Sequence, residues 1–117
     1  MPRTVLIVDD HAGFRAAARA VLEAEGFEVI AESATGWEAL EAVARFNPML
    51  VLLDIGLPDV DGFEVAGRLT TADRSLAVVL TSSRDASDYP TCIESSGARG
   101  FIPKAELSGA AFAALTG

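Results

Sequence analysis

The amino-acid sequence predicts an α/β fold of the (βα)5 type, a doubly wound parallel five-stranded sheet with helices on both faces. Three observations lead to this prediction. Short runs of valine, isoleucine and leucine recur along the chain, each too short for a helix. Segments with helical periodicity separate these runs, so strands and helices alternate. The central apolar run shows no polar alternation, which is typical of a parallel strand buried on both faces.

The apolar runs mark five predicted strands. Turn-forming residues bound each run, which favours short strands over parts of longer helices. Strands that alternate with helices are joined by right-handed crossovers, and this arrangement produces a parallel sheet. The predicted strands cover residues 5–8, 29–30, 49–53, 78–80 and 101–102.

The segments after the first three strands carry apolar residues at helical spacing. Two local signals support these helices: Thr35 and Glu38 form a capping box, and Gly26 lies where the end of a helix favours a left-handed residue. The apolar faces contain Phe14, Ala18, Val21 and Leu22; then Trp37, Leu40, Val43 and Ala44; and then Phe63, Ala66 and Leu69.

The last two helices differ in the strength of their pattern. Serines and Pro90 interrupt the fourth, within residues 87–96, so we expect it to be short or mobile. The fifth is expected over residues 106–115, an alanine-rich segment in which Leu107, Phe112 and Leu115 are apolar.

Composition limits the classes of function. The chain has 117 residues, half of them hydrophobic, and a formal net charge of −8, which indicates one domain over residues 1–117. The negative charge opposes binding to nucleic acids and anionic membranes. No segment approaches the roughly 20 apolar residues that span a bilayer, and the apolar run before Asp9 is too short for a secretory signal. We expect a cytoplasmic protein with no direct nucleic-acid binding and no membrane segment.

Polar side chains follow the predicted strands at their carboxyl ends, where doubly wound folds bind ligands. Asp9 and Asp10 follow the first strand, Asp54 the third, Thr81 the fourth and Lys104 the fifth. Close carboxylates repel by about 4 kcal/mol per pair at an effective dielectric of 20 and need a cation. Mg2+ prefers oxygen ligands and leaves positions open for a phosphoryl oxygen. Although Asp10 alone could be a helix N-cap, the set predicts a site for Mg2+ or Mn2+.

Asp54 ends an apolar strand, and its carboxylate could attack phosphorus to form an acyl phosphate. Phosphoryl transfer requires positioning and neutralisation of charge. The metal and Lys104 would neutralise charge. The Thr81 hydroxyl and the backbone N–H groups of Ile55 and Ser82 would donate hydrogen bonds to the phosphoryl oxygens.

Four segments, VLIVDD, LLDIGLPDVDG, VVLTSS and GFIPKAEL, resemble in order and spacing the receiver domain of two-component response regulators over essentially the whole chain. The resemblance implies a strand order of 2-1-3-4-5. It also implies that Asp54 accepts a phosphoryl group from a phosphohistidine of a sensor histidine kinase or a phosphotransfer protein, and that the domain then switches conformation. The implied ligands of Mg2+ are Asp9, Asp10, Asp54 and the backbone carbonyl of Gly56.

The resemblance assigns further roles. Lys104 would contact the phosphoryl group, Thr81 would be the switch hydroxyl and Phe101 the switch aromatic. Many receivers have a proline after this lysine, whereas Ala105 follows it here, so we expect a lysine that is held less rigidly. VDDHAGFR and GFIPKAEL are most similar to receivers with a C-terminal helix-turn-helix output domain. The chain is then a stand-alone receiver or part of a longer regulator, and a homodimer is compatible with the resemblance.

The same residues argue against two other functions of α/β folds and leave one alternative open. A phosphatase of the haloacid dehalogenase type has a second aspartate two residues after the nucleophile, where this chain has Gly56. A flavin-binding domain needs a phosphate loop after the first strand, where acidic DDHAG would repel phosphate. The remaining alternative is a receiver-like interaction module that works without phosphorylation.

Several residues receive structural interpretations. Asp59 and Asp61, in PDVDG, are interpreted as solvated loop residues. His11 is expected at a surface position of the first helix rather than in proton transfer. Trp37 and Cys92 are expected to pack rather than to react.

Overall fold

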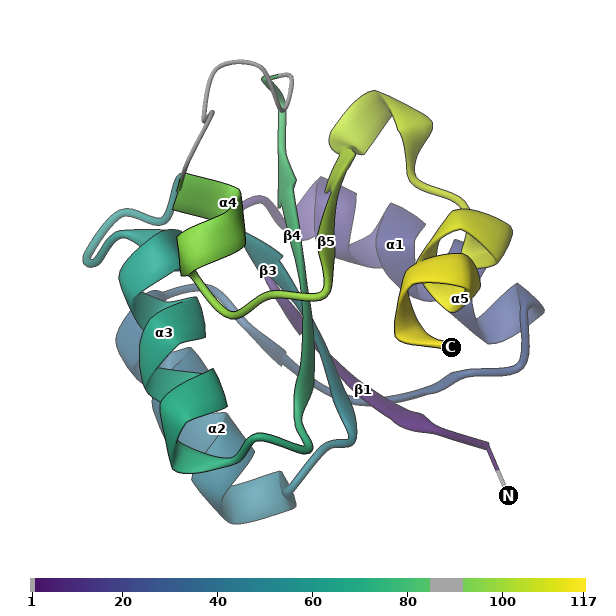
Figure 1. The fold of residues 1–117 in the computed structure, drawn as a ribbon. Coiled ribbons are helices and arrows are strands. Elements are labelled where there is room, and N and C mark those ends of the chain that lie inside the picture. Colours follow the sequence, from purple (N-terminus) through teal and green to yellow (C-terminus); the bar gives the residue numbers. More distant parts are fainter. Residues whose placement is uncertain (1, 85–91) are drawn as a thin grey trace.

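The computed structural model describes residues 2–84 and 92–117, which form three layers with the sheet in the middle (Figure 1). All four strand pairs are parallel, and the order is β2-β1-β3-β4-β5. The predicted fold class and strand order are therefore confirmed. The strands are β1 (Thr4–Val8), β2 (Glu28–Ser33), β3 (Leu50–Asp54), β4 (Ala77–Ser82) and β5 (Gly100–Pro103).

Helices cover both faces of the sheet (Figure 1). Helices α1 and α5 pack on one face, and α2, α3 and α4 on the other. Of the helices that the structure describes, none is long and apolar enough to cross a bilayer. The helices are α1 (Ala12–Ala24), α2 (Gly36–Phe46), α3 (Gly62–Ala72), α4 (Cys92–Ser95) and α5 (Gly109–Thr116), with a 3-10 helix at Lys104–Glu106.

Two hydrophobic clusters, one on each face of the sheet, form the core. Strand β1 contributes to both, because Val5 and Ile7 point to the α1 and α5 side while Leu6 and Val8 point to the α2 and α3 side. This alternation buries both faces of the strand, which is why its apolar run is continuous. The rigid strands bring their carboxyl ends to one edge of the sheet.

The local helix signals behave as predicted. The Glu38 N–H donates to Thr35 Oγ1 at 3.1 Å, and Glu38 Oε1 accepts the N–H of Ala34 at 3.0 Å, so the capping box is formed. Gly26 has φ +102°, a left-handed conformation that a glycine adopts without a steric penalty.

The start of the last helix was predicted too early. The segment expected over residues 106–115 begins in the 3-10 helix, and Leu107 is then extended. Helix α5 starts only after Ser108, whose Oγ accepts the N–H of Ala111 at 3.0 Å. A serine N-cap with extended backbone therefore outweighs the helical periodicity of the residues before it.

The fourth helix was predicted within residues 87–96. Residues 85–91 lie outside the described part of the chain, so most of this prediction is not tested. The described portion is the single turn of α4.

Asp59 and Asp61 are exposed, as predicted, but both also cap helices, which the prediction did not include. Asp59 accepts the N–H groups of Gly36 and Trp37 at 2.8 and 3.0 Å, so it caps α2 from the loop that follows β3. Although partial desolvation acts to raise it, the pKa of Asp59 is lowered overall by these N–H donors. Asp61 is the N-cap of α3 and accepts the N–H of Phe63 at 2.7 Å. Both carboxylates satisfy helix N–H groups that would otherwise lack partners.

Two further expectations, on Trp37 and Cys92, need correction, and the alternative that Asp10 caps α1 is excluded. Trp37 is 50% exposed, and the Arg68 guanidinium lies 5.3 Å from its ring centroid, so the ring packs under a cation rather than in the core. Cys92 is exposed. Asp10 does not cap α1, because the N-cap residue is His11 and makes no side-chain cap hydrogen bond.

Candidate functional site

Three aspartates meet at the carboxyl ends of β1 and β3. Oxygen atoms of Asp9, Asp10 and Asp54 and a ring nitrogen of His11 all lie within 4.8 Å of one another. Asp9 is completely buried and Asp54 is 4% exposed. Asp10, His11 and Gly56 are exposed around them, so the cluster opens to solvent.

Lys104 brings the positive charge to this cluster from the end of β5. Its Nζ lies 2.6 Å from Asp9 Oδ2 and 3.6 Å from Asp54 Oδ2. The same ammonium lies 4.5 Å from the ring centroid of Phe14 on α1, a cation–π contact. The sequence placed Phe14 only on the core face of the first helix. Lys104 therefore contacts Asp9, Asp54 and Phe14, and these contacts hold its ammonium in place although Ala105 stands where many receivers have a proline.

The cluster is short of positive charge. The pKa of Asp54 is raised by burial and by the neighbouring Asp9 carboxylate, although the Gly56 N–H, 3.1 Å away, and Lys104 act to lower it. One ammonium thus faces two buried carboxylates, with a third at their side. Hard carboxylate oxygens at this spacing fit Mg2+ or Mn2+, which would supply the missing charge.

The main chain of Asp9 is held in place by α1 and β2. Arg15 donates through a terminal guanidinium nitrogen to the Asp9 carbonyl at 2.6 Å, and its Nε pairs with Glu32 at 3.0 Å. The Asp9 N–H donates to the carbonyl of Ser33 at 3.0 Å. Sequence reasoning missed Arg15, which lies one turn after the aspartates in DDHAGFR. The carboxylate of Asp9 then contacts Lys104 through Oδ2 and accepts the His11 N–H through Oδ1.

Thr81 lies beside Asp54, its partner in the parallel pairing of β3 and β4. Its side chain is completely buried, and among the described residues its Oγ1 has no hydrogen-bond partner. A buried hydroxyl without a partner costs about 1–3 kcal/mol, so the Thr81 hydroxyl is free to bond a ligand at Asp54.

The backbone N–H groups near Asp54 already have acceptors in the unphosphorylated structure, so their predicted role as phosphoryl donors stays a prediction. In this structure the Ile55 N–H donates to the Thr81 carbonyl at 3.0 Å, because it continues the ladder between β3 and β4. The N–H that reaches the Asp54 carboxylate is that of Gly56. Ser82 follows Thr81 at the end of β4, and its Oγ accepts the N–H of Arg84 at 3.1 Å.

The loop after Asp54 folds back tightly against the strand. The Gly62 N–H donates to the Ile55 carbonyl at 3.1 Å. A Cβ at Gly62 would lie 2.5 Å from the Asp54 carbonyl oxygen and 2.6 Å from the Ile55 Cα, so only glycine fits there. This contact fixes Gly56, whose carbonyl is a predicted metal ligand, within a closed turn. Phe101, the predicted switch aromatic, is half-buried on β5. It pairs with Leu80 of β4 and packs against the hydrophobic core on the α2 and α3 face of the sheet.

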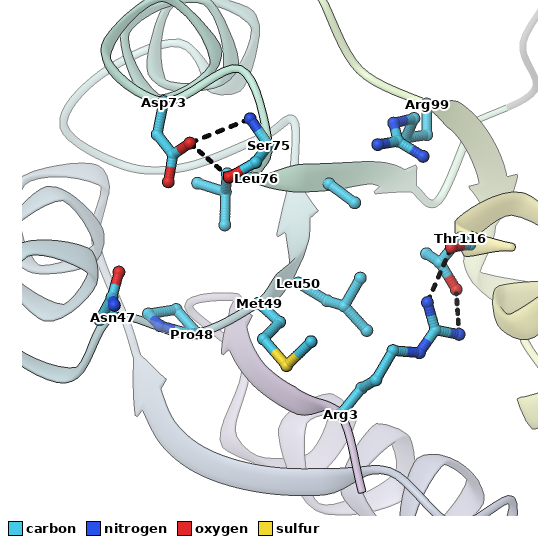
Figure 2. Close-up of a pocket in the computed structure, with 11 residues that line it drawn as sticks. Arg3, Asn47, Pro48, Met49, Leu50, Asp73, Ser75, Leu76, Arg99 and Thr116 are labelled. Carbon is cyan, nitrogen blue, oxygen red and sulfur yellow. Dashed lines mark hydrogen bonds between the residues drawn. The ribbon is translucent and has the colours of Figure 1, made fainter. Parts of the chain in front are cut away.

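A cavity of about 400 Å³ lies at the opposite, amino-terminal edge of the sheet (Figure 2). Two pairs of its polar residues are hydrogen-bonded to each other. Arg3 donates to the carbonyl and hydroxyl oxygens of Thr116 at 2.7 and 3.1 Å, and Asp73 Oδ1 accepts the N–H and the hydroxyl of Ser75 at 2.9 and 2.6 Å. The predicted site residues do not line this cavity.

Comparisons with known proteins agree with this geometry. A family model described as the response regulator receiver domain matches residues 5–115. The chain belongs to the response regulator receiver family. Accepting a phosphoryl group is the function of this family, whose members are phosphoacceptor signalling domains rather than classical enzymes. Receiver domains bind Mg2+ at an acidic pocket and interact with histidine kinases or phosphotransfer proteins.

Relatives include both long regulators and single receivers. The virulence-factor transcription regulator BvgA of Bordetella pertussis is 42% identical over 106 residues, which are 91% of this chain and 51% of BvgA. A transcriptional regulator of Pseudomonas aeruginosa is 43% identical over 103 residues, 87% of this chain and 49% of that protein. The chain thus spans about half the length of these regulators. The chemotaxis protein CheY of Bacillus subtilis is 32% identical over 104 residues, 89% of this chain and 87% of CheY.

Solved receiver structures have the same fold. The receiver domain of NarL from Mycobacterium tuberculosis superposes with a TM-score of 0.86 at 28% identity, covering 99% of this chain and 98% of that one. A chain of the CheX–CheY–BeF3–Mg2+ complex from Borrelia burgdorferi gives a TM-score of 0.84 at 29% identity, covering 98% and 87% of the two chains.

Proposed function

We propose that Asp54 is the phosphoacceptor and that it takes its phosphoryl group from a phosphohistidine of a sensor histidine kinase or a phosphotransfer protein. The observation that carries this proposal is the meeting of Asp54 with Asp9, Asp10 and Lys104 at a solvent-open edge. Such kinases and transfer proteins place the reaction in the cytoplasm. Mg2+ or Mn2+ is the expected cofactor.

Charge neutralisation explains the arrangement of the acids. A divalent ion, when bound by Asp9, Asp10, Asp54 and the Gly56 carbonyl, would offset the negative charge that gathers during transfer. An oxygen of Asp54 forms the new bond to phosphorus as the bond between phosphorus and the donor's imidazole nitrogen breaks, and the electron pair stays on that nitrogen. Lys104, 3.6 Å from Asp54, is placed to contact a phosphoryl oxygen.

The switch begins at Thr81. A phosphoryl oxygen on Asp54 supplies the partner that the buried Thr81 hydroxyl lacks in the described structure. Movement of Thr81 toward it, together with the Ser82 N–H, opens space that Phe101 can fill. The surface of α4, β5 and α5 then changes shape. Turning a 1:99 mixture of states into 99:1 requires about 5.5 kcal/mol, within reach of several charge-assisted contacts.

The domain also catalyses loss of the phosphoryl group. Gly56 and Ser83 flank the path of a water molecule toward Asp54, and both are small. We therefore expect hydrolysis to be fairly unobstructed, and a phosphoprotein half-life of many hours would contradict this. The domain acts catalytically only on its own phosphorylation and dephosphorylation.

The output lies outside this domain. Because BvgA and the Pseudomonas regulator are about twice as long as this chain and are named as transcription regulators, a C-terminal helix-turn-helix domain is the expected effector. DNA contacts would then belong to that domain and not to this acidic receiver. A homodimer of receivers is a second route by which the switch could act.

Phosphorylation with a small donor tests the proposal directly. The protein is incubated with acetyl phosphate or phosphoramidate and Mg2+, and intact mass spectrometry measures the added phosphoryl mass. We expect one phosphoryl group on the wild-type chain and none on Asp54→Asn. Asp73→Asn, which removes a carboxylate from the opposite edge, is the matched control and should be labelled normally. No label on the wild-type chain would favour the phosphorylation-independent interaction module.

A further inference from the structure

His11 is the only histidine of the chain, and its ring lies against the carboxylates of the site. Its Nδ1 is 3.1 Å from Asp9 Oδ1 and 3.0 Å from Asp10 Oδ1. The ring nitrogen also belongs to the group of atoms within 4.8 Å that includes an Asp54 oxygen. Because the side chain is 69% exposed, burial does not force the ring into this position.

The position of His11 at the start of α1 has no helix-capping purpose. His11 is the N-cap residue, with φ −100° and ψ 110°, yet its side chain makes no cap hydrogen bond. Serine, threonine, aspartate and asparagine are the side chains that stabilise this position. The His11 N–H instead donates to Asp9 Oδ1 at 2.8 Å. Both the main chain and the ring of His11 thus face the acids.

The distances between these atoms suit coordination of one metal ion. In an octahedral site with bonds of about 2.1 Å, neighbouring ligand atoms lie about 3.0 Å apart. Nδ1 lies 3.1 Å from Asp9 Oδ1, with which it forms a hydrogen bond, and 3.0 Å from Asp10 Oδ1, so one cation could replace these contacts without moving the ring far. A second observation directs a ligand to the same place, because the buried Thr81 hydroxyl beside Asp54 has no partner in the described part of the chain.

We propose that His11 Nδ1 is a further ligand of the divalent cation bound by Asp9, Asp10 and Asp54. Mg2+ favours oxygen ligands, whereas imidazole nitrogen favours the first-row transition ions, with affinity rising from Mn2+ through Co2+ to Ni2+. His11 therefore makes the site selective for transition ions beyond what its carboxylates alone would give. This inference rests on the proposed metal site, but not on the identity of the phosphoryl donor.

Pulsed electron paramagnetic resonance of bound Mn2+ tests the ligand directly. The intact chain is loaded with Mn2+ and examined for coupling to a directly bound nitrogen. Because the chain has one histidine, labelling histidine with 15N must change that coupling if the ligand is His11. We expect the coupling in the wild-type chain and its loss in His11→Ala. Mn2+ bound without nitrogen coupling would overturn the proposal.

Metal titrations provide the second readout. If His11 only supported the structure, its loss would lower the affinity for all of these ions alike. Calorimetry with Mg2+, Mn2+, Co2+ and Ni2+ compares the wild-type chain with His11→Ala. We expect the Ni2+ affinity to fall by at least about tenfold, because loss of even a residue that only supports a metal ligand lowers affinity by about 10–100-fold. The Mg2+ affinity should fall much less. An equal fall for both ions would show that His11 only positions the acids and would overturn the proposal.

Asp10→Asn separates this inference from the proposed function. If it leaves Mn2+ and Mg2+ binding unchanged, the acidic site itself is not the metal site, and both proposals fail. If Asp10→Asn abolishes binding while the nitrogen coupling is absent from the wild-type chain, only the role of His11 fails.

Discussion

Two aspartates, Asp73 at the amino-terminal edge of the sheet and Asp54 at the carboxyl-terminal edge, have pKa values shifted in opposite directions. The Ser75 hydroxyl and N–H lower the pKa of Asp73, whereas burial and the Asp9 carboxylate raise that of Asp54. At the first edge Arg3 is hydrogen-bonded to Thr116 and Asp73 to Ser75 (Figure 2). At the second edge the Thr81 hydroxyl has none among the described residues.

This difference shows what each edge contributes. The amino-terminal edge stabilises the resting fold, because the charges of Arg3 and Asp73 are hydrogen-bonded by neighbouring residues. The carboxyl-terminal edge stabilises the fold less than it could, since its carboxylates need a cation and its hydroxyl needs an acceptor or donor. The unmet interactions become available when a cation and a phosphoryl group bind, which is how a site can act as a switch.

Removing Lys104 should have the largest effect on the difference between the two edges. Lys104→Met leaves Asp9 and Asp54 without their ammonium, and loss of one partner from a buried ion pair costs about 3 kcal/mol. We expect the free energy of unfolding to fall by this amount in denaturant titrations without metal, and phosphorylation by acetyl phosphate to slow by about 100-fold or more. Mg2+ should restore part of the stability. The matched control is Arg99→Met, which removes an exposed cation at the opposite edge; an equal loss there would contradict the comparison.

Asp54→Asn should stabilise the metal-free fold while it abolishes phosphorylation. Because the folded pKa is raised above 3.8, the contribution of Asp54 to stability is complete below about pH 3.8 and is lost as the pH rises through the folded pKa. Ionised Asp54 therefore costs stability at pH 7. We expect a Tm higher by at least about 4 °C for thermal unfolding in a metal chelator at pH 7. The repulsion of about 4 kcal/mol from Asp9 is only partly offset by the attraction to Lys104, and about 1 kcal/mol moves the Tm of a chain of this length by about 4 °C.

The pH dependence gives the control for this result. The gain from Asp54→Asn should shrink as the pH falls toward 3.8. Asp73→Asn should do the opposite, because a lowered pKa contributes stability above pH 3.8 that is lost as the pH falls through the folded value. A Tm of Asp54→Asn below that of the wild-type chain at pH 7 would show that ionised Asp54 does not destabilise the metal-free fold.

Arg3→Met should have the smallest effect and should be confined to stability. It removes the two hydrogen bonds to Thr116 that close one side of the cavity in Figure 2. We expect the free energy of unfolding to fall by about 1 kcal/mol, the usual net value of such bonds. The rate of labelling by acetyl phosphate should stay at the wild-type value, because Arg3 lies far from the acids along the sheet. Slower labelling would mean that the two edges are coupled.

The sequence predicted the fold and the residues at the acidic edge for one physical reason. Parallel strands all end at one edge, so the polar residues after each strand meet there whatever the loops do. The sequence therefore predicted that Asp9, Asp54 and Lys104 lie close together, because each follows one of three apolar runs. Thr81 followed from the same rule.

Features that depend on loop geometry could not be predicted in this way. Asp59 caps α2 across a distance of more than 20 residues in sequence, which no local pattern reveals. The contact of Phe14 with Lys104 and the bond of Arg15 to the Asp9 carbonyl depend on how α1 rotates over the site. The sequence also did not show that the ladder with β4 extends one residue beyond Asp54 and engages the Ile55 N–H in the unphosphorylated structure.

The contact of Gly62 with the Asp54 backbone has a practical consequence for protein engineering. Because Gly62, the first residue of α3, packs against the carbonyl of Asp54, the proposed phosphoacceptor, residues 54–62 behave as one cassette whose two ends are in contact. Length changes within that cassette would push the helix off the strand. A designer who transplants this chemistry to another scaffold must carry the strand end, the turn and the helix start together, while insertions can be made elsewhere.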